Sequence, residues 1–412
     1  MEGIDNTPIQ LKHFTATLSG NITPPASKSE SNRVLIINAL TGNKGNLENL
    51  SNARDTQTMI RLLQSNDNVL DVIDAGTTMR FLTAYLSITG QEKVLTGTKR
   101  MCERPIKLLV DALKQLGAGI GYLQQEGYPP LEIKTFNKAN VKTNRLKIKG
   151  DVSSQYITAL LMIAPVLPQG MILELEGKIG SKPYIAMTLS LMKHFGINSE
   201  WKENSISIAP QSYQTASYKV ESDWSAASYW FAFTALSENA TIEILGYHKN
   251  SLQGDHVITQ IMDKCGVKTE FTNNGLKLSK QNHVASFTWD FTDCPDLAQT
   301  IVVVCAAKGI NCTLSGLESL RIKETDRIAA LQNEIRKFGA DLVEIEKDNI
   351  YQVIPGAFKV EGQLVNTYKD HRMAMAFAPL CLLGDVLIEA PEVTAKSYPH
   401  FWEDMKALGI QL

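Results

Sequence analysis

The sequence of 412 residues lacks long hydrophobic runs and an excess of charge of either sign. Its apolar stretches, such as 229–236 and 301–307, are far shorter than the roughly 18 residues that a membrane-spanning helix needs. The 41 Lys and Arg residues nearly balance the 43 Asp and Glu residues, so no overall field favours nucleic acid or an anionic membrane. These absences predict a soluble protein in which any polyanion site is a local concentration of basic residues.

The sequence also lacks a CxxC pair and the spacing of a zinc site. Several of its 6 cysteines lie inside apolar runs, which is typical of reduced, buried thiols in a cytosolic protein. The first ten residues contain two acids and no basic apolar segment, so we expect neither a secretory signal nor a transit peptide. We therefore expect a cytoplasmic protein without a metal, long enough for two or three domains.

A helical pattern followed by glycine and then by an apolar or strand-like segment occurs five times. The glycine can adopt the left-handed conformation that closes a helix. The five glycines follow one another at intervals of 70 to 79 residues, and they are Gly117, Gly196, Gly266, Gly339 and Gly409. A weaker sixth match ends near Asn66, which also tolerates the left-handed conformation. The pattern predicts six βα-type units grouped into two globular halves.

Two segments place hydroxyls, backbone N–H groups and cations at a predicted helix start, which is an arrangement that binds anions. The first, TPPASKSESNRVLI at 23–36, contains Lys28 and Arg33, and the second, DAGTTMRF at 74–81, contains Gly76 and Arg80. For the first segment alone, a capped surface helix with solvated bases is an alternative. The chain has neither a GxxxxGK[ST] nor a GxGxxG string, so it lacks the usual signatures of nucleotide and dinucleotide binding.

Six further segments carry polar or basic residues at predicted loops or helix starts: RMCERP at 100–105, DVSSQY at 151–156, GSKPYI at 180–185, RIKETDRI at 321–328, YKDHRMAMAFAPL at 368–380 and TAKSYPHFWEDM near the end. In RIKETDRI, Lys323 and Arg327 stand four apart on a predicted helix with Glu324 between them, and an ion-pair ladder is the alternative there. Two phosphorylated carboxylic acids would bring about five or six negative charges. Eight cations in these segments could balance that negative charge: Lys28, Arg33, Arg80, Arg104, Lys323, Arg327, Arg372 and Lys396.

The strings PASKSESNR, AGTTMR, LTGTKRMCERP, SSQYITALLM, SKPY, KETDR, DHRMAMAF and TAKSYP resemble, in this order, those of the 5-enolpyruvylshikimate-3-phosphate (EPSP) synthase family. The resemblance implies an α/β fold, an inside-out α/β barrel of two globular domains built from repeated βαβαββ units. It also implies transfer of the enolpyruvyl group of phosphoenolpyruvate to the 5-hydroxyl of shikimate 3-phosphate, without a cofactor. We expect one domain to comprise 1–23 and 222–412 and the inserted domain 24–221, with hinges near 21–25 and 220–225.

The resemblance further implies a site for each substrate. The residues expected to bind shikimate 3-phosphate are Lys28, Ser29, Arg33, Ser153, Ser154, Ser181, Tyr184, Asp296 and Lys323. Those expected to bind phosphoenolpyruvate are Lys28, Gly76, Arg104, Gln155, Arg327, Arg372 and Lys396. Gly76 would also leave room for glyphosate. We expect these small molecules to be the partners of a monomer that binds neither nucleic acid nor membrane.

The family reaction needs a proton acceptor for the hydroxyl and a proton donor for the methylene carbon. The resemblance assigns the first role to Asp296 and the second to Glu324, and Lys28 could share either. The residues alone leave alternatives open: Asp296 could cap the helix that follows it, and Glu324 could form an ion pair without a role in proton transfer. His371 is expected to be a structural hydrogen-bond partner.

The chain departs from the family pattern at several positions. Asp74 and Phe81 replace an asparagine and a proline, Ser319 stands where an asparagine is common, and Ala26 replaces a glycine. The first unit is short, so we expect it to lack strands that are usually present. Two alternatives therefore remain: a UDP-N-acetylglucosamine enolpyruvyl transferase, whose reactive cysteine lies farther ahead of its Arg-Pro than Cys102 does here, and a non-catalytic anion-binding relative. We expect Cys102 to be a spectator.

Overall fold

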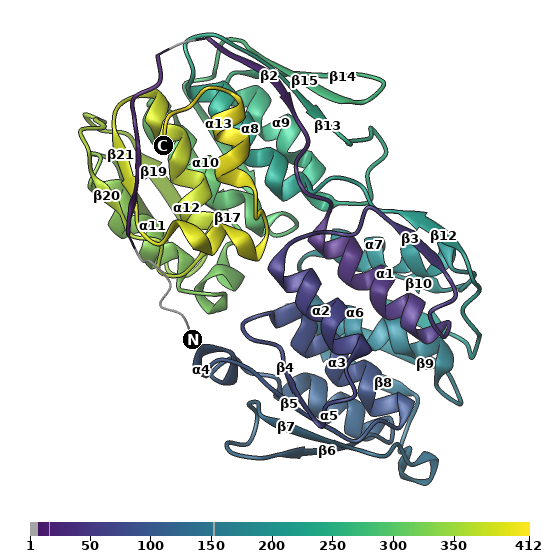
Figure 1. Ribbon diagram of the computed structural model, residues 1–412. Coiled ribbons are helices and arrows are strands. Elements are labelled where there is room, and N and C mark those ends of the chain that lie inside the picture. The colour runs from purple at the N-terminus through teal and green to yellow at the C-terminus, as the bar shows by residue number, and fades with distance from the viewer. Residues whose placement is uncertain (1–6, 16, 151–152) are drawn as a thin grey trace. The chain divides into compact units, whose positions relative to one another are not determined.

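The computed structural model describes residues 7–15, 17–150 and 153–412, and it forms two compact units (Figure 1). The first unit is Met1–Ala26 together with Glu221–Leu412, and the second is Ser27–Val220. The chain therefore passes between units after Ala26 and after Val220, close to the boundaries expected after residues 23 and 221. That these units act as hinged domains stays a prediction.

The second unit contains two complete βαβαββ subdomains. In each, two parallel strands flank a helix, a second helix follows, and an antiparallel hairpin completes a four-stranded sheet, in the orders β4-β5-β7-β6 and β10-β11-β9-β8. The elements of the first are β4 (Val69–Asp71), α3 (Gly76–Thr89), β5 (Lys93–Thr96), α5 (Lys107–Gln115), β6 (Gly119–Tyr122) and β7 (Leu131–Lys134), with a short α4 (Lys99–Cys102) before α5. Those of the second are β8 (Arg145–Lys149), α6 (Ser154–Ile163), β9 (Met171–Glu176), α7 (Lys182–His194), β10 (Glu200–Lys202) and β11 (Ser205–Ile208).

The third subdomain of this unit is short. It consists of α1 (Lys28–Leu40), β3 (Asn46–Glu48), α2 (Arg54–Gln64) and β12 (Ser217–Lys219), and its sheet is the single parallel pair of β12 and β3. The chain runs from α2 directly to β4, so the antiparallel hairpin is missing among the described residues. This confirms the expected shortening of the first unit.

The first unit repeats the same arrangement with one incomplete sheet. Its complete subdomains are β2 (Leu18–Ile22), α8 (Trp224–Leu236), β13 (Ala240–Leu245), α9 (Ile258–Lys264), β14 (Val267–Phe271) and β15 (Gly275–Lys280), and then β16 (Ser286–Asp290), α10 (Ala298–Lys308), β17 (Asn311–Ser315), α11 (Arg327–Arg336), β18 (Asp341–Glu346) and β19 (Ile350–Ile354). The third contains β20 (Leu364–Val365), α12 (His371–Phe377), β21 (Val386–Ile388) and α13 (Phe401–Ala407), and β1 (Ile9–Leu11) is its third strand. Six subdomains are present among the described residues, but only four of their sheets are complete.

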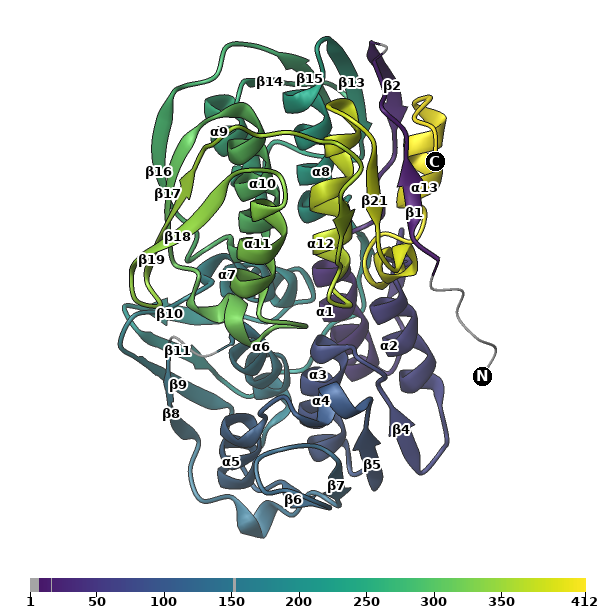
Figure 2. The ribbon, with the colours of Figure 1, turned by 90° about the vertical axis from the view of Figure 1, so that its left-hand side faces the viewer.

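The helices between the parallel strands form the core of each unit. Every residue of α12 is buried, and so is every residue of α8 except Ser225. A helix that is apolar on all sides cannot leave a face in water, so it is enclosed by other elements. In the first unit α8, α10 and α12 pack side by side (Figure 2). Consequently the residues at their N-terminal ends come together.

All five expected helix-closing glycines have a positive φ, between +85° and +101°. The sixth expectation is wrong, because α2 ends at Ser65 in an extended conformation (φ −80°, ψ 136°) and Asn66 is not left-handed. No described helix is both long enough and apolar enough to cross a membrane.

Candidate active site

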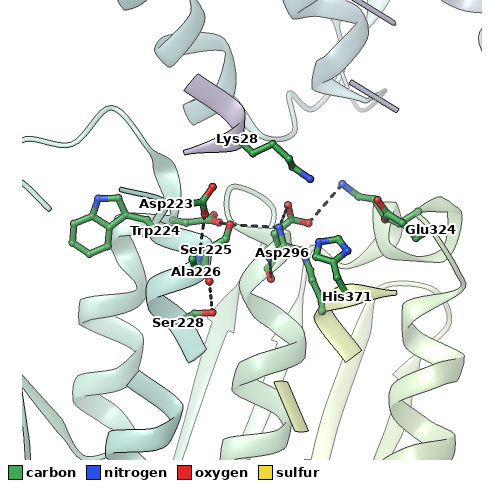
Figure 3. Close-up of polar contacts among 12 residues, drawn as sticks. Lys28, Asp223, Trp224, Ser225, Ala226, Ser228, Asp296, Glu324 and His371 are labelled. Atoms are coloured by element: carbon green, nitrogen blue, oxygen red, sulfur yellow. Dashed lines mark hydrogen bonds and ion pairs between the residues drawn. The ribbon is translucent and has the colours of Figure 1, made fainter. Parts of the chain in front are cut away.

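Asp296 is held by two arginines at the N-terminal end of α10. It lies in the 3₁₀ turn Pro295–Leu297, and Figure 3 shows its side chain. Its Oδ1 accepts a hydrogen bond from Arg327 Nη1 at 2.9 Å, and its Oδ2 accepts one from Arg372 Nη2 at 2.8 Å. Lys323 Nζ lies 3.8 Å from Oδ1. The side chain forms no cap hydrogen bond with α10, so the alternative of an N-cap is wrong.

Arg327 is the centre of this cluster. It is 2% exposed, and besides Asp296 it contacts Asp370, through Nε at 2.7 Å, and Glu324, through Nη2 at 2.9 Å. A guanidinium presents five N–H donors in a rigid fork, which allows one side chain to hold three carboxylates. Glu324 Oε1 also lies 3.9 Å from Lys396 Nζ. The ion pair expected as an alternative role for Glu324 is therefore present, within a larger network.

The expected helix over Lys323–Arg327 is wrong. The helix α11 begins only at Arg327, because the Asp326 side chain caps it by accepting hydrogen bonds from the N–H groups of Ile328 and Ala329. Lys323 and Glu324 lie in the turn between the 3₁₀ helix Glu318–Ile322 and this cap. Neither residue is part of α11. Lys323 lies beside Asp296, and Glu324 lies beside Arg327.

Opposing charges control protonation in this cluster. Burial by itself would raise the pKa of Asp296, but Arg372, Lys323 and Arg327 outweigh burial and hold the pKa well below its usual range. Burial likewise would lower the pKa of Arg327, and the carboxylates of Asp370, Glu324 and Asp296 raise it instead. Asp296 is thus a carboxylate at neutral pH.

The start of α12 supplies the other half of the cluster. Asp370 is the N-cap, accepting a hydrogen bond from the Arg372 N–H at 2.9 Å, and it also holds Arg327. His371 is 1% exposed, and its Nδ1 lies 3.6 Å from Asp370 Oδ1. Its expected role as a structural hydrogen-bond partner stays a prediction. Lys396, at the end of the 3₁₀ helix Pro391–Lys396, is 1% exposed.

In the second unit the start of α1 is buried, so the alternative of a capped surface helix is wrong. Ser27 caps α1, and Lys28 Nζ lies 3.0 Å from Asp55 Oδ2. Arg33 is 3% exposed, and its fork donates to the Ser29 carbonyl at 2.8 Å and to two threonine hydroxyls, Thr188 at 2.9 Å and Thr158 at 3.2 Å. Burial lowers the pKa of Arg33 to about 10.

Arg104 lies against the start of α3. A Cβ added to Gly76 would be only 2.6 Å from Arg104 Nη1, so the guanidinium uses the space that the missing side chain leaves. Arg80 was expected to add to the anion site, but it is 3% exposed and donates to the Pro105 carbonyl at 2.9 Å. The Tyr156 hydroxyl donates to the same carbonyl. Arg80 therefore anchors the loop that carries Arg104.

The remaining expected residues lie at the starts of α6 and α7. Ser153 caps α6, Ser154 is its first residue, and Gln155 Nε2 donates to Thr77 Oγ1 on α3 at 3.2 Å. Ser181 precedes α7 in a left-handed conformation with φ 55°. Tyr184 packs against Arg33, whose guanidinium carbon is 5.6 Å from the ring centroid. Residues 151–152 of the same string lie outside the described residues.

The departures are accommodated locally. Asp74 accepts hydrogen bonds from Arg54 Nη2 on both oxygens, at 3.1 and 3.2 Å, so its charge is paired. Phe81 is fully buried under the guanidinium of Arg33, 5.6 Å from its ring centroid. Ser319 lies partly buried in the 3₁₀ helix before Lys323. The six cysteines are free, five of them buried and Cys102 partly so. Within the described ranges no cluster of His, Cys, Asp and Glu could hold a metal ion.

Sequence reasoning missed several partners of these groups: Asp55, Asp223, Ser225 and Asp255. Asp223 caps α8 through the Ala226 N–H at 3.1 Å, and an aspartate before an apolar run is a recognisable capping signal. Ser225 Oγ donates to Asp255 Oδ2 and lies 3.4 Å from Arg372 Nη2. No local signal connects Ser225 to Asp255, because 30 residues separate them.

The comparisons with known proteins agree with this arrangement. The model of the family described as EPSP synthase (3-phosphoshikimate 1-carboxyvinyltransferase) matches residues 13–66 and 63–405. A 3-phosphoshikimate 1-carboxyvinyltransferase of Bacteroides fragilis (strain YCH46) is 47% identical over 398 residues, covering 95% of this chain and 96% of that protein. One of Vibrio atlanticus (strain LGP32) is 35% identical over the whole of both chains, 442 aligned positions at 100% coverage.

The fold has also been seen in solved structures. An EPSP synthase from Acinetobacter baumannii at 2.37 Å superposes with a TM-score of 0.76 and 19% sequence identity, covering 98% of each chain. This likeness concerns the fold, whereas the sequence matches extend through every motif named above. The chain therefore belongs to the EPSP synthase family.

Proposed function

We propose that the protein transfers the enolpyruvyl group of phosphoenolpyruvate to the 5-hydroxyl of shikimate 3-phosphate and releases inorganic phosphate. The observation that carries this proposal is Asp296, a partly buried carboxylate held between Arg327 and Arg372 beside Lys323. This cluster combines a group that can accept a proton with cations that can bind the phosphate and carboxylate of the substrates. The alternative of a UDP-N-acetylglucosamine enolpyruvyl transferase is not favoured, because the family match and the named relatives are EPSP synthases.

Phosphoenolpyruvate engages five cations together with Gly76 and Gln155. The proposed set is Lys28, Gly76, Arg104, Gln155, Arg327, Arg372 and Lys396. Arginine forks match carboxylate and phosphate oxygens bidentately, which orients the ligand as well as neutralising it. Gly76 contributes by its missing side chain, since that space holds the Arg104 guanidinium.

Shikimate 3-phosphate engages the hydroxyls and cations at the starts of α1, α6 and α7 and beside Asp296. The proposed set is Lys28, Ser29, Arg33, Ser153, Ser154, Ser181, Tyr184, Asp296 and Lys323. Because Arg33 is almost fully buried, its contribution is to fix Ser29 and the Tyr184 ring. Ser153 and Ser154 add hydroxyls at a helix N-terminus, where a phosphate is favoured.

The reaction forms a bond between the hydroxyl oxygen and the central carbon of phosphoenolpyruvate while the methylene carbon gains a proton. The methyl carbon so formed then gives up one proton as phosphate leaves the tetrahedral intermediate, and the double bond is restored. Asp296 accepts the hydroxyl proton and Glu324 serves the methylene carbon, with Lys28 as the third candidate for either proton. Substrate anions that draw Arg327 and Arg372 away from Asp296 would raise its pKa and make it a better proton acceptor.

The test is a phosphate-release assay without added metal. Purified protein is mixed with phosphoenolpyruvate and shikimate 3-phosphate, and UDP-N-acetylglucosamine is supplied as the acceptor in a parallel reaction. Phosphate release with shikimate 3-phosphate as the acceptor, but not with UDP-N-acetylglucosamine, supports the proposal. Calorimetric binding of both ligands without release would identify a non-catalytic relative instead.

The Arg104→Ala variant tests the site assignment within the same assay. We expect it to raise the KM for phosphoenolpyruvate far more than the KM for shikimate 3-phosphate, because the guanidinium serves the first ligand. Equal effects on both constants would contradict the assignment.

The protein is further proposed to act as a monomer in the cytoplasm. Its six free cysteines fit a reducing compartment. Light scattering of the purified protein, with and without both substrates, measures the oligomeric state.

A further inference from the structure

Asp255 is a buried carboxylate to which the proposed reaction gives no role. It lies in the 3₁₀ turn Gly254–Val257, which packs against α8, and it is 4% exposed. Its Oδ2 accepts a hydrogen bond from Ser225 Oγ, whereas its Oδ1 is buried without a hydrogen-bond partner among the described residues. A buried carboxylate is costly, so its retention at this place requires a reason.

Ser225 connects Asp255 to the active-site cluster. It is the one residue of α8 that is not fully buried, and its Oγ lies 3.4 Å from Arg372 Nη2. The same Nη2 donates to Asp296 Oδ2 at 2.8 Å. A serine hydroxyl has one proton and two lone pairs. When that proton is donated to Asp255, the lone pairs of Ser225 face the guanidinium.

Asp255 also acts on Arg372 through its charge. The charged groups that face it are Arg372 on α12, Asp296 before α10 and Asp223 at the start of α8. The charge of Asp255 also acts on the Cys294 thiol and contributes to its raised pKa. Burial, strengthened by Asp296, raises the pKa of Asp255 to about 7, although the Ser225 hydrogen bond and Arg372 oppose the rise. The carboxyl group therefore changes its charge close to neutral pH.

We infer that Asp255 is a positioning residue that orients Arg372 through the Ser225 hydroxyl and so sets the strength of the anion site at Arg372. The inference rests on the proposed function, which assigns Arg372 to phosphoenolpyruvate. Two effects follow. Loss of the acceptor at residue 255 loosens Arg372, and a negative charge at residue 255 weakens the attraction of Arg372 for an anion.

Three variants separate these effects: Asp255→Ala, which removes the acceptor, Ser225→Ala, which removes the link, and Asp255→Asn, which keeps an acceptor but cannot ionise. At pH 6 we expect each alanine variant to raise the KM for phosphoenolpyruvate about tenfold, the value of one hydrogen bond. The KM for shikimate 3-phosphate should stay within about twofold. The double alanine variant should be no worse than either single one, because both break the same connection.

The asparagine variant tests the pH dependence of the KM for phosphoenolpyruvate, which a purely structural role of Asp255 would not change. Its KM for phosphoenolpyruvate should match that of the wild type at pH 6 and fall at least about threefold below it at pH 8.5, where only the wild type carries the charge. Because both proteins meet the same ionisation state of the substrate, their ratio isolates residue 255. Asp404→Asn, which changes a carboxylate that accepts a hydrogen bond from Tyr398 at 2.6 Å, is the matched control.

The outcomes distinguish this inference from the proposed function. Suppose that the wild type releases phosphate. The inference alone is then overturned if the effects of the two alanine substitutions on the KM add up, or if the asparagine variant follows the wild-type pH profile. If the wild type releases no phosphate, the proposed function fails, and calorimetric titration of the same variants with phosphoenolpyruvate still tests the inference by the same ratios. A wild type that does not bind phosphoenolpyruvate overturns both.

Discussion

Arg327 Nη1 donates to Asp296 Oδ1 at 2.9 Å, across 31 residues of sequence and from one helix start to another. The pair is nearly dry, since the Arg327 side chain is 2% exposed and that of Asp296 is 18% exposed. A buried ion pair is not strong evidence of stability, because desolvation offsets the attraction. Its value here is that it keeps an ionised carboxylate and a guanidinium fork ready for substrates.

Removal of the Arg327 guanidinium should destabilise the protein strongly. Arg327→Met leaves three carboxylates, those of Asp296, Glu324 and Asp370, without their shared cation, and we expect a loss of about 3–5 kcal/mol in the free energy of unfolding. Urea denaturation measures it. Arg336, at the exposed end of the same helix, pairs with Asp341, and Arg336→Met should cost less than about 1 kcal/mol. Similar losses for both variants would contradict the central role of Arg327.

Addition of one methyl group at Gly76 should weaken phosphoenolpyruvate binding. In Gly76→Ala the new Cβ would meet Arg104 Nη1 at 2.6 Å and displace it, and we expect the KM for phosphoenolpyruvate to rise about tenfold or more. The melting temperature should not fall, because alanine favours a helix over glycine. Gly121→Ala, whose Cβ would have its nearest contact with Glu132 Oε2 at 3.4 Å, is the control. An unchanged KM in Gly76→Ala would show that Arg104 adapts without loss.

A lysine cannot replace Arg33. Its ammonium cannot reach Thr188, Thr158 and the Ser29 carbonyl together, so Arg33→Lys should lose about 1–3 kcal/mol of stability and raise the KM for shikimate 3-phosphate. Thermal unfolding and steady-state kinetics measure the two effects. Arg61→Lys, an exposed arginine with a hydrogen bond to the Asp71 carbonyl, should change neither by a measurable amount. The prediction fails if both variants behave like the wild type.

The raised pKa of Asp255 predicts a pH dependence of stability. The folded pKa of about 7 lies above the ordinary value of roughly 3.9, so between these values the folded state keeps a proton that the unfolded state has lost. Stability from this group therefore falls as pH rises through that window and is constant above it. Asp255→Asn removes the titration, so its melting temperature minus that of the wild type should increase between pH 5 and pH 8. A constant difference would place the folded pKa of Asp255 near its ordinary value.

Local signals in the chain predicted much of this molecule. The five glycines that close helices, the shortened first unit and the starts of α1, α3 and α12 could be located because each depends on a few neighbouring residues. The start of α11 was misplaced. Four-residue spacing suggested a helix through Lys323, but Asp326 caps the backbone and delays the helix to Arg327.

The sequence alone therefore established the family, the subdomain pattern and the chemical character of the site, since caps, left-handed glycines and motif strings are written within short windows. The partners of the charged groups depended on the packing of the core helices. Asp296 meets Arg372 across 76 residues and Ser225 meets Arg372 across 147, and Arg80, which looks like a ligand in the sequence, anchors a loop. Such pairings follow from which helix ends pack together, and no window of sequence contains that information.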